Sequence, residues 1–449
     1  MNKENNIIYF LGIGGIGMSA LARYFNHQGY SIYGYDLTPT PLTHQLEKEG
    51  MIIHYEENVS LIPDKVDFVV YTPAVPADNQ EYQHFLSKQI PIKKRAEVLG
   101  EISQRHFTVA VAGTHGKTSI STLIAHLLKQ AGIKVTALVG GISKNYRSNF
   151  ITSEKTDILV LEADEYDRSF LKLHPDIAIV TSVEPDHLDI YGTTKDLENT
   201  FVLFSKQLKE TGTLIHPGSL RLFDQTARKQ ITYSTTGKAD CKAENITIKN
   251  GRYQFDLHFN DQKIREIRML IPGLHDIENA LAASITGFLL GLKADEIKRG
   301  LETFSGVERR FDYRIQSPNL IFIDDYAHHP AELTATIQAV KKLYPGKKIT
   351  GVFQPHLYSR TRDFAKEFAK SLESLDQIVL LDIYPAREKP IEGISSKIIL
   401  DQIDHPNKTL ISKDSLTDYL KKNKPEVLLT LGAGDIGLML NQIEKAINE

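Results

Sequence analysis

A strand-like apolar run, residues 107–112, is followed directly by the sequence GTHGKTS. A glycine-lined turn between a strand and a helix points backbone N–H groups at anionic oxygens, and the positive end of the helix adds to this attraction. Lys117 is placed to reach terminal phosphates, and the hydroxyl of Thr118 can bind magnesium. The loop therefore predicts a nucleoside triphosphate site formed by Gly113, Thr114, His115, Gly116, Lys117, Thr118 and Ser119.

The spacing of this loop departs from the usual pattern GxxxxGK[ST]. That pattern places its first glycine at position 111, where this chain has Val111, and the loop has Gly113 instead. The alternative interpretation is a helix that begins with a glycine and carries an incidental lysine. We interpret the sequence as a shortened variant of the phosphate-binding loop.

A second glycine turn, GIGGIG, lies near the N-terminus between a predicted strand and a predicted helix. It fits GxGxxG, and Asp36 follows at the spacing expected of a ribose-binding acid. The motif alone favours NAD, but such a turn binds any pyrophosphate, so UDP-sugars qualify equally. Tight packing without a ligand is the remaining alternative. The candidate ligand-binding residues are Gly14, Gly15, Ile16, Gly17 and Asp36.

Two more strands of the central region end in acidic sequences. Glu162 ends the strand that leads into EADE, and His187 lies between Asp186 and Asp189 after the next strand. Ligands bind at the carboxyl ends of strands in an open α/β sheet, so we expect these groups at the edge that carries the phosphate loop. Thr118, Glu162 and His187 are the predicted magnesium site, although magnesium prefers oxygen and capping would also explain the histidine.

Further polar residues lie near the predicted buried helix at residues 277–290 and near residue 310, where we expect the second of two junctions between domains. His275 and Asn279 are placed to face an adenine ring, and helix capping explains them about as well. Arg309 and Arg310 lie where a guanidinium can approach a γ-phosphate, or can simply be solvated.

In the last third of the chain, DDYAHHP and QPHLYSRTR each follow a predicted strand. Either sequence alone is typical of a solvated loop, but two on one sheet edge favour function. The candidates are His328, His356 and Arg360.

Composition restricts the classes of protein that fit. The chain has 449 residues with mixed charges and a net charge of -3, which argues against a nucleic-acid partner or an anionic membrane. Cys241 is the only cysteine, so disulfides within the chain and cysteine-rich zinc sites are excluded. The N-terminal apolar stretch is too short for a secretory signal or a membrane span. We expect a cytoplasmic protein without membrane insertion, as a monomer or homodimer.

These chemical groups need three α/β domains to position them. Residues 1–106 predict a small doubly wound domain with strands at 7–11, 31–35, 68–72 and 90–92. Residues 107–310 predict a central P-loop domain that a helix at 277–290 closes. Residues 311–449 predict a third βα series. The fold class is therefore α/β, with Rossmann-like N-terminal and C-terminal domains around a central ATPase-type domain.

With its motifs in this order, the chain closely resembles the Mur ligases, ATP-dependent amide-forming enzymes of peptidoglycan assembly. The resemblance covers nearly the full length. It is carried by GIGGIGMS, GTHGKT, EADE, EPDHLD, HDIENALAA, GVERRFD, DDYAHHP, QPHLYSRT, EKPI and LGAGDI.

The resemblance implies ATP and Mg²⁺ as cofactors, and UDP-N-acetylmuramate and L-alanine as substrates. It implies that Gly14 to Gly17 and Asp36 hold the uridine nucleotide and that Gly113 to Ser119 hold ATP. His275, Asn279 and Arg310 are then expected to contact the nucleotide. His328, His356 and Arg360 are expected to serve the muramoyl and amino-acid substrates, with Lys117, His187, Arg310 and His328 as the catalytic set.

Several positions depart from the family pattern. Phe10 replaces a frequent histidine, Asp276 replaces an asparagine, and Leu357 stands where many relatives have arginine. Some relatives carry a carbamylated lysine at the position of Phe201, so the resemblance implies that this chain lacks the modification.

The implied reaction activates a carboxylate as an acyl phosphate, which an amine then attacks. An NAD-dependent oxidoreductase is a competing hypothesis, but it leaves GTHGKTS unexplained. A nucleotide-driven switch is another. Within the family, a recycling ligase that attaches a tripeptide to the same UDP-sugar is the nearest alternative.

Overall fold

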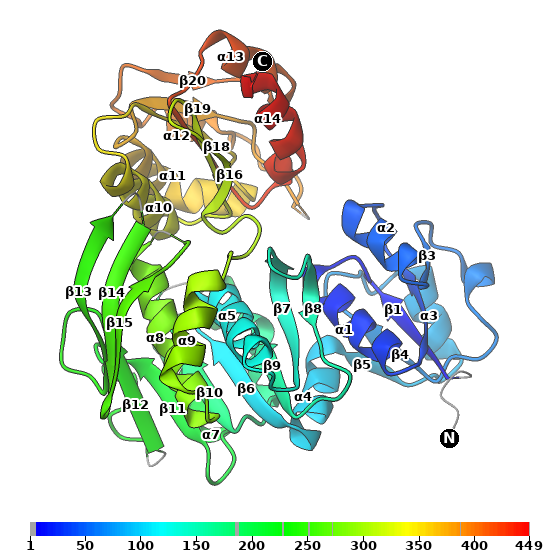
Figure 1. Cartoon of the computed structure of the whole chain (residues 1–449). Helices are drawn as coiled ribbons and strands as arrows, with labels where there is room; N and C mark the ends of the chain where they lie inside the picture. The colour runs from blue at the N-terminus through cyan, green and yellow to red at the C-terminus, as the bar shows by residue number, and fades with distance from the viewer. Residues whose placement is uncertain are drawn as a thin grey trace. The chain divides into compact units, whose positions relative to one another are not determined.

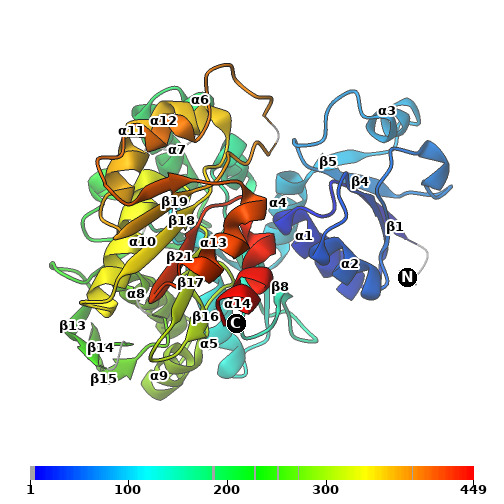
Figure 2. The same ribbon diagram turned by 90° about the horizontal axis from the view of Figure 1, so that it is seen from above.

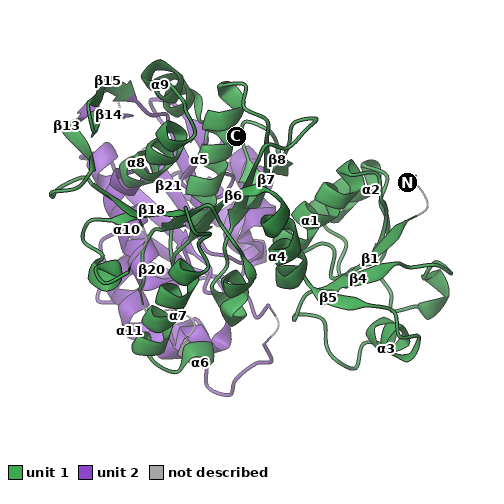
Figure 3. Ribbon diagram, turned by 90° about the horizontal axis from the view of Figure 1, so that it is seen from below, with its two compact units in different colours: residues 1–245, 255–267, 277–305 green, residues 246–254, 268–276, 306–449 purple. Residues whose placement is uncertain are grey.

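The computed structural model describes residues 6–184, 188–226, 229–249, 252–271, 273–386 and 388–448. Over these residues the strands form three sheets (Figure 1), which confirms the predicted α/β class. The chain divides into two compact units (Figure 3). Unit 1 comprises residues 1–245, 255–267 and 277–305, and unit 2 comprises residues 246–254, 268–276 and 306–449. The domain boundaries at residues 106 and 310 stay predictions.

The first sheet is parallel, with the order β3-β2-β1-β4-β5. Helix α1 packs on one face and α3 on the other, so the sheet is doubly wound as predicted. The strand at β3 was not predicted, and β5 begins at Ile92 instead of Ile90. The elements are β1 Ile7–Leu11, α1 Ile16–His27, β2 Ser31–Tyr35, α2 Pro41–Lys48, β3 Ile52–His54, η2 Val59–Leu61, β4 Phe68–Tyr71, α3 Gln80–Ser87, β5 Ile92–Lys94 and α4 Arg95–Arg105.

The second sheet has the order β15-β14-β13-β12-β11-β10-β6-β9-β7-β8. Its centre is parallel: Val111 of β6 pairs with Glu162 of β9 on one side and with Ile179 of β10 on the other. The strands are β6 Phe107–Ala112, β7 Val135–Ser143, β8 Ser148–Ile151, β9 Ile158–Glu162, β10 Ile177–Val180, β11 Thr213–Pro217, β12 Lys229–Ser234, β13 Cys241–Lys249, β14 Arg252–Phe259 and β15 Gln262–Arg268. The helices are α5 Lys117–Gln130, η3 Tyr166–Lys172, α6 Leu188–Tyr191, α7 Thr194–Lys206, η4 Arg221–Phe223, α8 Leu274–Leu289 and α9 Ala294–Thr303.

The third sheet lies in unit 2, with the order β16-β17-β21-β18-β19-β20 and only its edge strand β16 paired antiparallel. Helices α10 and α11 cover one face, and α13 and α14 cover the other (Figures 1 and 2). The elements are β16 Asp312–Gln316, β17 Ile321–Asp325, α10 Pro330–Leu343, β18 Ile349–Phe353, α11 Tyr358–Leu372, β19 Gln377–Leu380, α12 Lys397–Leu400, β20 Lys408–Leu410, η5 Lys413–Ser415, α13 Leu416–Lys422, β21 Val427–Leu431, η6 Asp435–Met439 and α14 Leu440–Asn448.

Aromatic side chains form the core beneath helix α7. Phe170 stacks on Phe204 with ring centroids 4.8 Å apart and meets Phe201 edge-on at 5.1 Å. The side chain of Phe201 is fully buried. The position that the family resemblance singled out therefore carries a core residue in this chain. In the described part of the chain, no helix is long and apolar enough to cross a membrane.

Replacing Phe201 with alanine removes a buried ring from this cluster. We expect Phe201→Ala to lower the free energy of unfolding by about 3–5 kcal/mol, because the lost packing leaves a cavity. Leu203→Ala on the same helix is the control, since that side chain is exposed and its loss is expected to cost about 0.5 kcal/mol or less. Urea unfolding of both variants measures the difference, and equal effects would contradict the assignment.

Candidate active site

The phosphate loop connects β6 to α5 through two glycines in the left-handed region. Gly113 has φ +131°, and a Cβ there would collide with the Thr181 hydroxyl. Gly116 has φ +80°, and a Cβ there would lie 3.0 Å from Oδ1 of Asn279. Both positions therefore need glycine. Helix α5 begins at Lys117 with Ser119 in its first turn, so its free N–H groups face the loop. The predicted strand, turn and helix are all present.

Lys117 is held inside the loop by acceptors of the protein itself. Its Nζ donates to the Gly113 carbonyl at 2.6 Å and lies 2.8 Å from Oε2 of Glu165, which is almost fully buried. Burial lowers the pKa of Lys117, but Glu165, Asp164 and Glu162 together outweigh it, so the pKa is raised and the ammonium stays charged. Glu165 was not predicted as a site residue, although it ends the EADE sequence.

Glu162 links the phosphate loop to strand β7. Both of its carboxylate oxygens lie 3.0 Å from the Thr118 hydroxyl, and Oε2 also accepts from the Gly140 N–H at 2.7 Å. The structure thus brings together two of the three predicted magnesium ligands. The third, His187, lies outside the described residues.

The donor set at Thr118 and Glu162 fits a small hard cation. A hydroxyl and a carboxylate offer oxygen ligands, and magnesium in nucleotide sites takes its other ligands from phosphates and water. Within the described ranges, no group of three or more His, Cys, Asp and Glu side chains could hold a metal ion.

The remainder of the loop is fixed by residues that follow β10. The hydroxyls of Thr114 and Ser182 lie 2.8 Å apart, and Ser182 Oγ accepts from the His115 N–H at 3.1 Å. The Thr181 hydroxyl donates to the His115 carbonyl. These contacts within the protein fix the shape of the loop, and such preorganisation reduces the entropy that a loop loses on binding.

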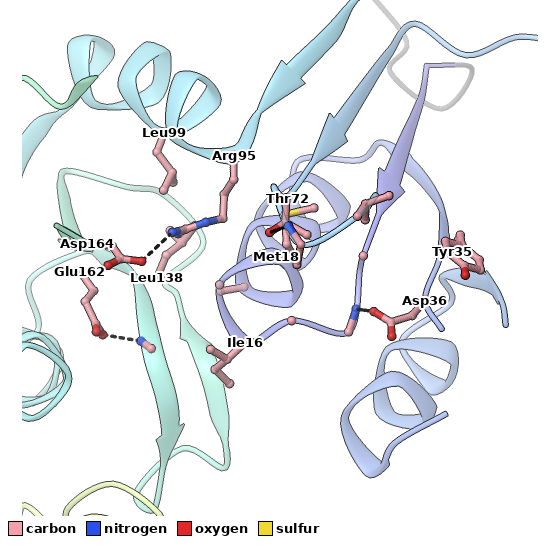
Figure 4. Close-up of a pocket in the computed structure, with 18 of the residues that line it drawn as sticks. Ile16, Met18, Tyr35, Asp36, Thr72, Arg95, Leu99, Leu138, Glu162 and Asp164 are labelled. Atoms are coloured by element: carbon pink, nitrogen blue, oxygen red, sulfur yellow. Dashed lines mark hydrogen bonds and ion pairs between the residues drawn. The ribbon is translucent and has the colours of Figure 1, made fainter. Parts of the chain in front are cut away.

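A pocket of about 630 Å³ runs from the first glycine turn to the second sheet (Figure 4). One end is lined by the predicted residues Gly14, Gly15, Ile16, Gly17 and Asp36. Oδ2 of Asp36 accepts from the Gly14 N–H at 2.7 Å, which holds the turn against β2. The other end is lined by Gly140, Glu162 and Asp164. The glycine turn and the carboxylate beside the phosphate loop therefore share one pocket.

Arg95 brings a positive charge into this pocket. A Cβ on Gly17 would lie 2.9 Å from its Nη1, so the guanidinium sits directly over the glycine turn. Its Nη2 lies 3.5 Å from Oδ2 of Asp164 (Figure 4). Arg95 was not singled out in the sequence, where the basic run KKR before a helix was the available signal.

The two predicted nucleotide residues of α8 differ in their surroundings. Asn279 is buried and packs against Gly116 of the phosphate loop. His275, one turn earlier on the same helix, is half exposed, and its Nε2 lies 3.6 Å from Oδ2 of Asp276. The structure thus brings Asn279 to the loop, whereas His275 belongs to unit 2.

Unit 2 gathers the remaining predicted residues around Tyr326. The guanidinium of Arg310 lies 4.9 Å from the centre of the Tyr326 ring, and the His328 ring is 5.3 Å away. His328 in turn meets His356 at 6.1 Å, and His356 stacks on Tyr384. The two sequences predicted to share a sheet edge therefore lie together.

The surroundings of His328 favour the neutral form of its imidazole. Burial lowers its pKa, and the charges of Arg360 and Arg310 lower it further, while Glu332 acts in the opposite direction. Its Nδ1 lies 3.0 Å from the Tyr326 carbonyl, which can only accept, so Nδ1 carries the hydrogen. Nε2 is then the basic nitrogen.

Arg309 and Arg310, adjacent in sequence, have different surroundings. Arg309 donates to the carbonyls of Gly432 and Gly434 and to buried Asp324, so it ties β17 to the loop after β21. The guanidinium of Arg310 instead lies over the Tyr326 ring, and its charge acts on Asp325 and His328. The geometry favours Arg310 as the arginine available to a ligand.

Models of the Mur ligase family match most of the chain. The family's catalytic domain matches residues 7–107, its middle domain matches residues 111–287, and its glutamate ligase domain matches residues 309–434.

Individual relatives match over the full length. The chain is 47% identical to a UDP-N-acetylmuramate–L-alanine ligase of Flavobacterium johnsoniae, with 100% of this chain and 99% of the relative covered. The enzyme of the same name from Porphyromonas gingivalis is 47% identical, with 98% of each chain covered. The crystal structure of the Thermotoga maritima UDP-N-acetylmuramate–alanine ligase superposes with a TM-score of 0.84 at 28% identity and covers 98% of this chain and 99% of that one.

The buried carboxyl of Asp325 makes stability depend on pH. Burial raises its pKa to about 6, against the charge of Arg310 and the N–H groups of Phe311 and Ala327. Between about pH 4 and pH 6 the folded state keeps a proton that the unfolded state has lost, so rising pH removes stability.

We expect wild type to lose up to about 3 kcal/mol relative to Asp325→Asn between pH 4 and pH 7. Urea unfolding of both proteins across this range gives the difference at each pH. A difference that does not change with pH, or that grows in favour of wild type as pH rises, would contradict the raised pKa.

Proposed function

Because the chain belongs to the Mur ligase family, we infer that it joins L-alanine to UDP-N-acetylmuramate with cleavage of ATP to ADP and phosphate, in peptidoglycan synthesis. The observation that carries this proposal is the single pocket between Asp36 and Glu162. A UDP-sugar seated on the glycine turn would have its far end beside the carboxylate that contacts Thr118 of the phosphate loop. The relatives' shared name supports the same substrates.

The two nucleotides need different parts of unit 1. The glycine turn, the start of α1 and Arg95 are suited to a diphosphate, because they combine N–H donors with a guanidinium. The loop from Gly113 to Ser119 is suited to the phosphates of ATP, with Asn279 packed against it. Thr118, Glu162 and, by family resemblance, His187 would hold Mg²⁺, which when bound neutralises phosphate charge and polarises the γ-phosphoryl group.

The chemistry explains why ATP is needed. A free carboxylate does not acylate an amine at neutral pH, because one of its oxygens would have to leave as oxide or hydroxide, and both are poor leaving groups. We propose that the lactyl carboxylate of the UDP-sugar takes the γ-phosphoryl group and forms an acyl phosphate. The L-alanine amine then attacks the carbonyl carbon, and phosphate leaves with the C–O bonding electrons. Lys117 stabilises the charge on the transferring group, and we assign Arg310 the same role.

The amine must lose a proton for this attack. We assign this step to Nε2 of His328, whose neutral form is favoured by burial and by nearby arginines. His356 and Arg360, which belong to the same unit, are assigned to the muramoyl and amino-acid substrates. Since the reaction uses ATP and a UDP-sugar, we place it in the cytoplasm.

A phosphate-release assay tests the assignment directly. We expect release only when ATP, Mg²⁺, UDP-N-acetylmuramate and L-alanine are all present, with a tripeptide that begins with L-alanine giving none. Lys117→Ala is expected to reduce the rate about 10²–10³-fold, because it removes charge stabilisation from the transition state. Absence of release in every combination would defeat the proposed function, and release with the tripeptide alone would favour the recycling reaction.

Trapping tests the intermediate. Hydroxylamine is expected to convert the acyl phosphate to a hydroxamate of UDP-N-acetylmuramate when ATP is present and L-alanine is omitted. The same mixture with Lys117→Ala should give little hydroxamate. Ligation that proceeds normally while no hydroxamate forms would count against the acyl-phosphate route.

A further inference from the structure

Unit 1 contains a buried carboxylate that the proposed reaction does not use. Glu81 of α3 is fully buried. Its Oε2 accepts from the Tyr9 hydroxyl at 2.6 Å, and its Oε1 lies 2.7 Å from Nε2 of His54 and accepts from the Asn58 N–H at 2.9 Å. A buried carboxylate is costly unless its hydrogen bonds are made, so this network strongly favours one arrangement of the groups around it.

The network fixes the segment that follows β3. Glu81 holds His54 at one end of this segment and the Asn58 N–H at the other. Between them, Glu57 is held by the Gln80 N–H, which donates to its Oε2 at 3.0 Å. Glu57 lines the pocket that begins at the glycine turn, whereas Glu81 is fully buried and is not among the residues that line it. Glu81 therefore fixes a segment that contributes Glu57 to the wall of the pocket.

Three neighbouring strands of the first sheet each contribute residues to the pocket, in the order in which the strands lie in the sheet. The glycine turn follows β1, Asp36 follows β2, and Glu57 follows β3, which is the edge strand on that side. This step rests on the proposed function: if the diphosphate lies on the turn after β1, the ribose lies near Asp36 and the base lies near Glu57. The exposed side chain of Leu37 also lines this end and offers an apolar face to a planar ring.

The hydrogen-bonding groups of the uracil base indicate a role for the Glu57 carboxylate. Uracil presents an N3–H donor between two carbonyl oxygens, and an ionised carboxylate only accepts hydrogen bonds. Both oxygens of Asp36 already accept backbone N–H groups, from Gly14 and Thr38. Glu57 has one oxygen bound to Gln80 and keeps acceptor capacity on the other.

We propose that Glu57 selects the uracil base by accepting its N3–H, and that Glu81 is the positioning residue that holds Glu57 in place. Glu57 follows β3 of the first sheet and Glu81 lies on α3, whereas the phosphate loop follows β6 of the second sheet. Their loss therefore acts on recognition of the UDP-sugar and not on transfer of the phosphoryl group.

Calorimetric titration with UDP and with the diphosphate of N3-methyluridine tests the role of Glu57. We expect wild type to bind UDP about tenfold or more tightly than the methylated analogue, because a charged hydrogen bond is lost. Glu57→Ala is expected to weaken UDP binding by a similar factor and to bring the ratio of the two affinities close to one. Glu56→Ala is the matched control, since it removes the neighbouring exposed carboxylate, and it should retain the wild-type ratio.

Kinetics of Glu81→Gln test the positioning role. An amide places donors where the buried carboxylate accepts them, so we expect the KM for UDP-N-acetylmuramate to rise about tenfold while kcat and the KM for ATP stay unchanged. The affinity ratio for UDP over the methylated analogue should fall as well, which a loss of stability alone would not cause. Glu101→Gln, which removes an exposed carboxylate paired with Lys93, is the control.

The outcomes separate the two proposals. UDP binding with an unchanged affinity ratio in Glu57→Ala overturns the selection of uracil by Glu57 and leaves the ligase assignment intact. A normal ratio in Glu81→Gln, or a parallel fall in kcat and in melting temperature, overturns the positioning role. Failure of wild type to bind UDP at all overturns the proposed nucleotide site and this inference with it.

Discussion

Parallel pairing of β6 with β9 and β10 brings three strand ends to one edge of the second sheet. The phosphate loop leaves the middle strand, Glu162 ends one neighbour, and Thr181 follows the other. Because Val111 is in register with Glu162, the carboxylate is carried to the height of the loop, within 3.0 Å of the Thr118 hydroxyl. The glycine that the common motif has at position 111 would lie within β6, in register with Glu162 and Ile179, and the chain has a buried valine there. The loop can begin two residues later because Gly113 makes the turn.

Much of this arrangement could be predicted from the sequence, because strand ends, glycine turns and their polar neighbours are local patterns. The phosphate loop, Glu162, Asp36 and the polar segments after β17 and β18 all followed from that rule. The contacts that depend on packing could not be predicted. Glu165 reaches Lys117 across 48 positions, and Glu81 reaches Tyr9 across 72. No periodic pattern marks such pairs, since they depend on which side chains the tertiary fold brings together.

Neighbouring residues of one type also acquired different roles from their surroundings. Residue type alone does not distinguish Arg309 from Arg310, and only the family resemblance singled out Arg310; the fold uses Arg309 to join β17 to the glycines after β21, while Arg310 lies over Tyr326. The same holds for three acids around the first sheet: Asp36 shapes a turn, Glu57 lines a pocket, and Glu81 of α3 is fully buried. In each case the hydrogen-bond partners within the protein decide the role. A side chain that already makes its hydrogen bonds within the protein has fewer donors or acceptors left for a ligand.

The ion pair between Lys117 and Glu165 has a consequence for how tightly nucleotides bind. The charged ammonium of Lys117 is paired with Glu165 inside the protein, so a phosphate that bound this lysine would exchange one anionic partner for another and gain only the difference between them. Ligands with little negative charge have nothing to gain from this exchange. Under the proposed function, this ion pair would therefore favour a triphosphate over a diphosphate at the phosphate loop.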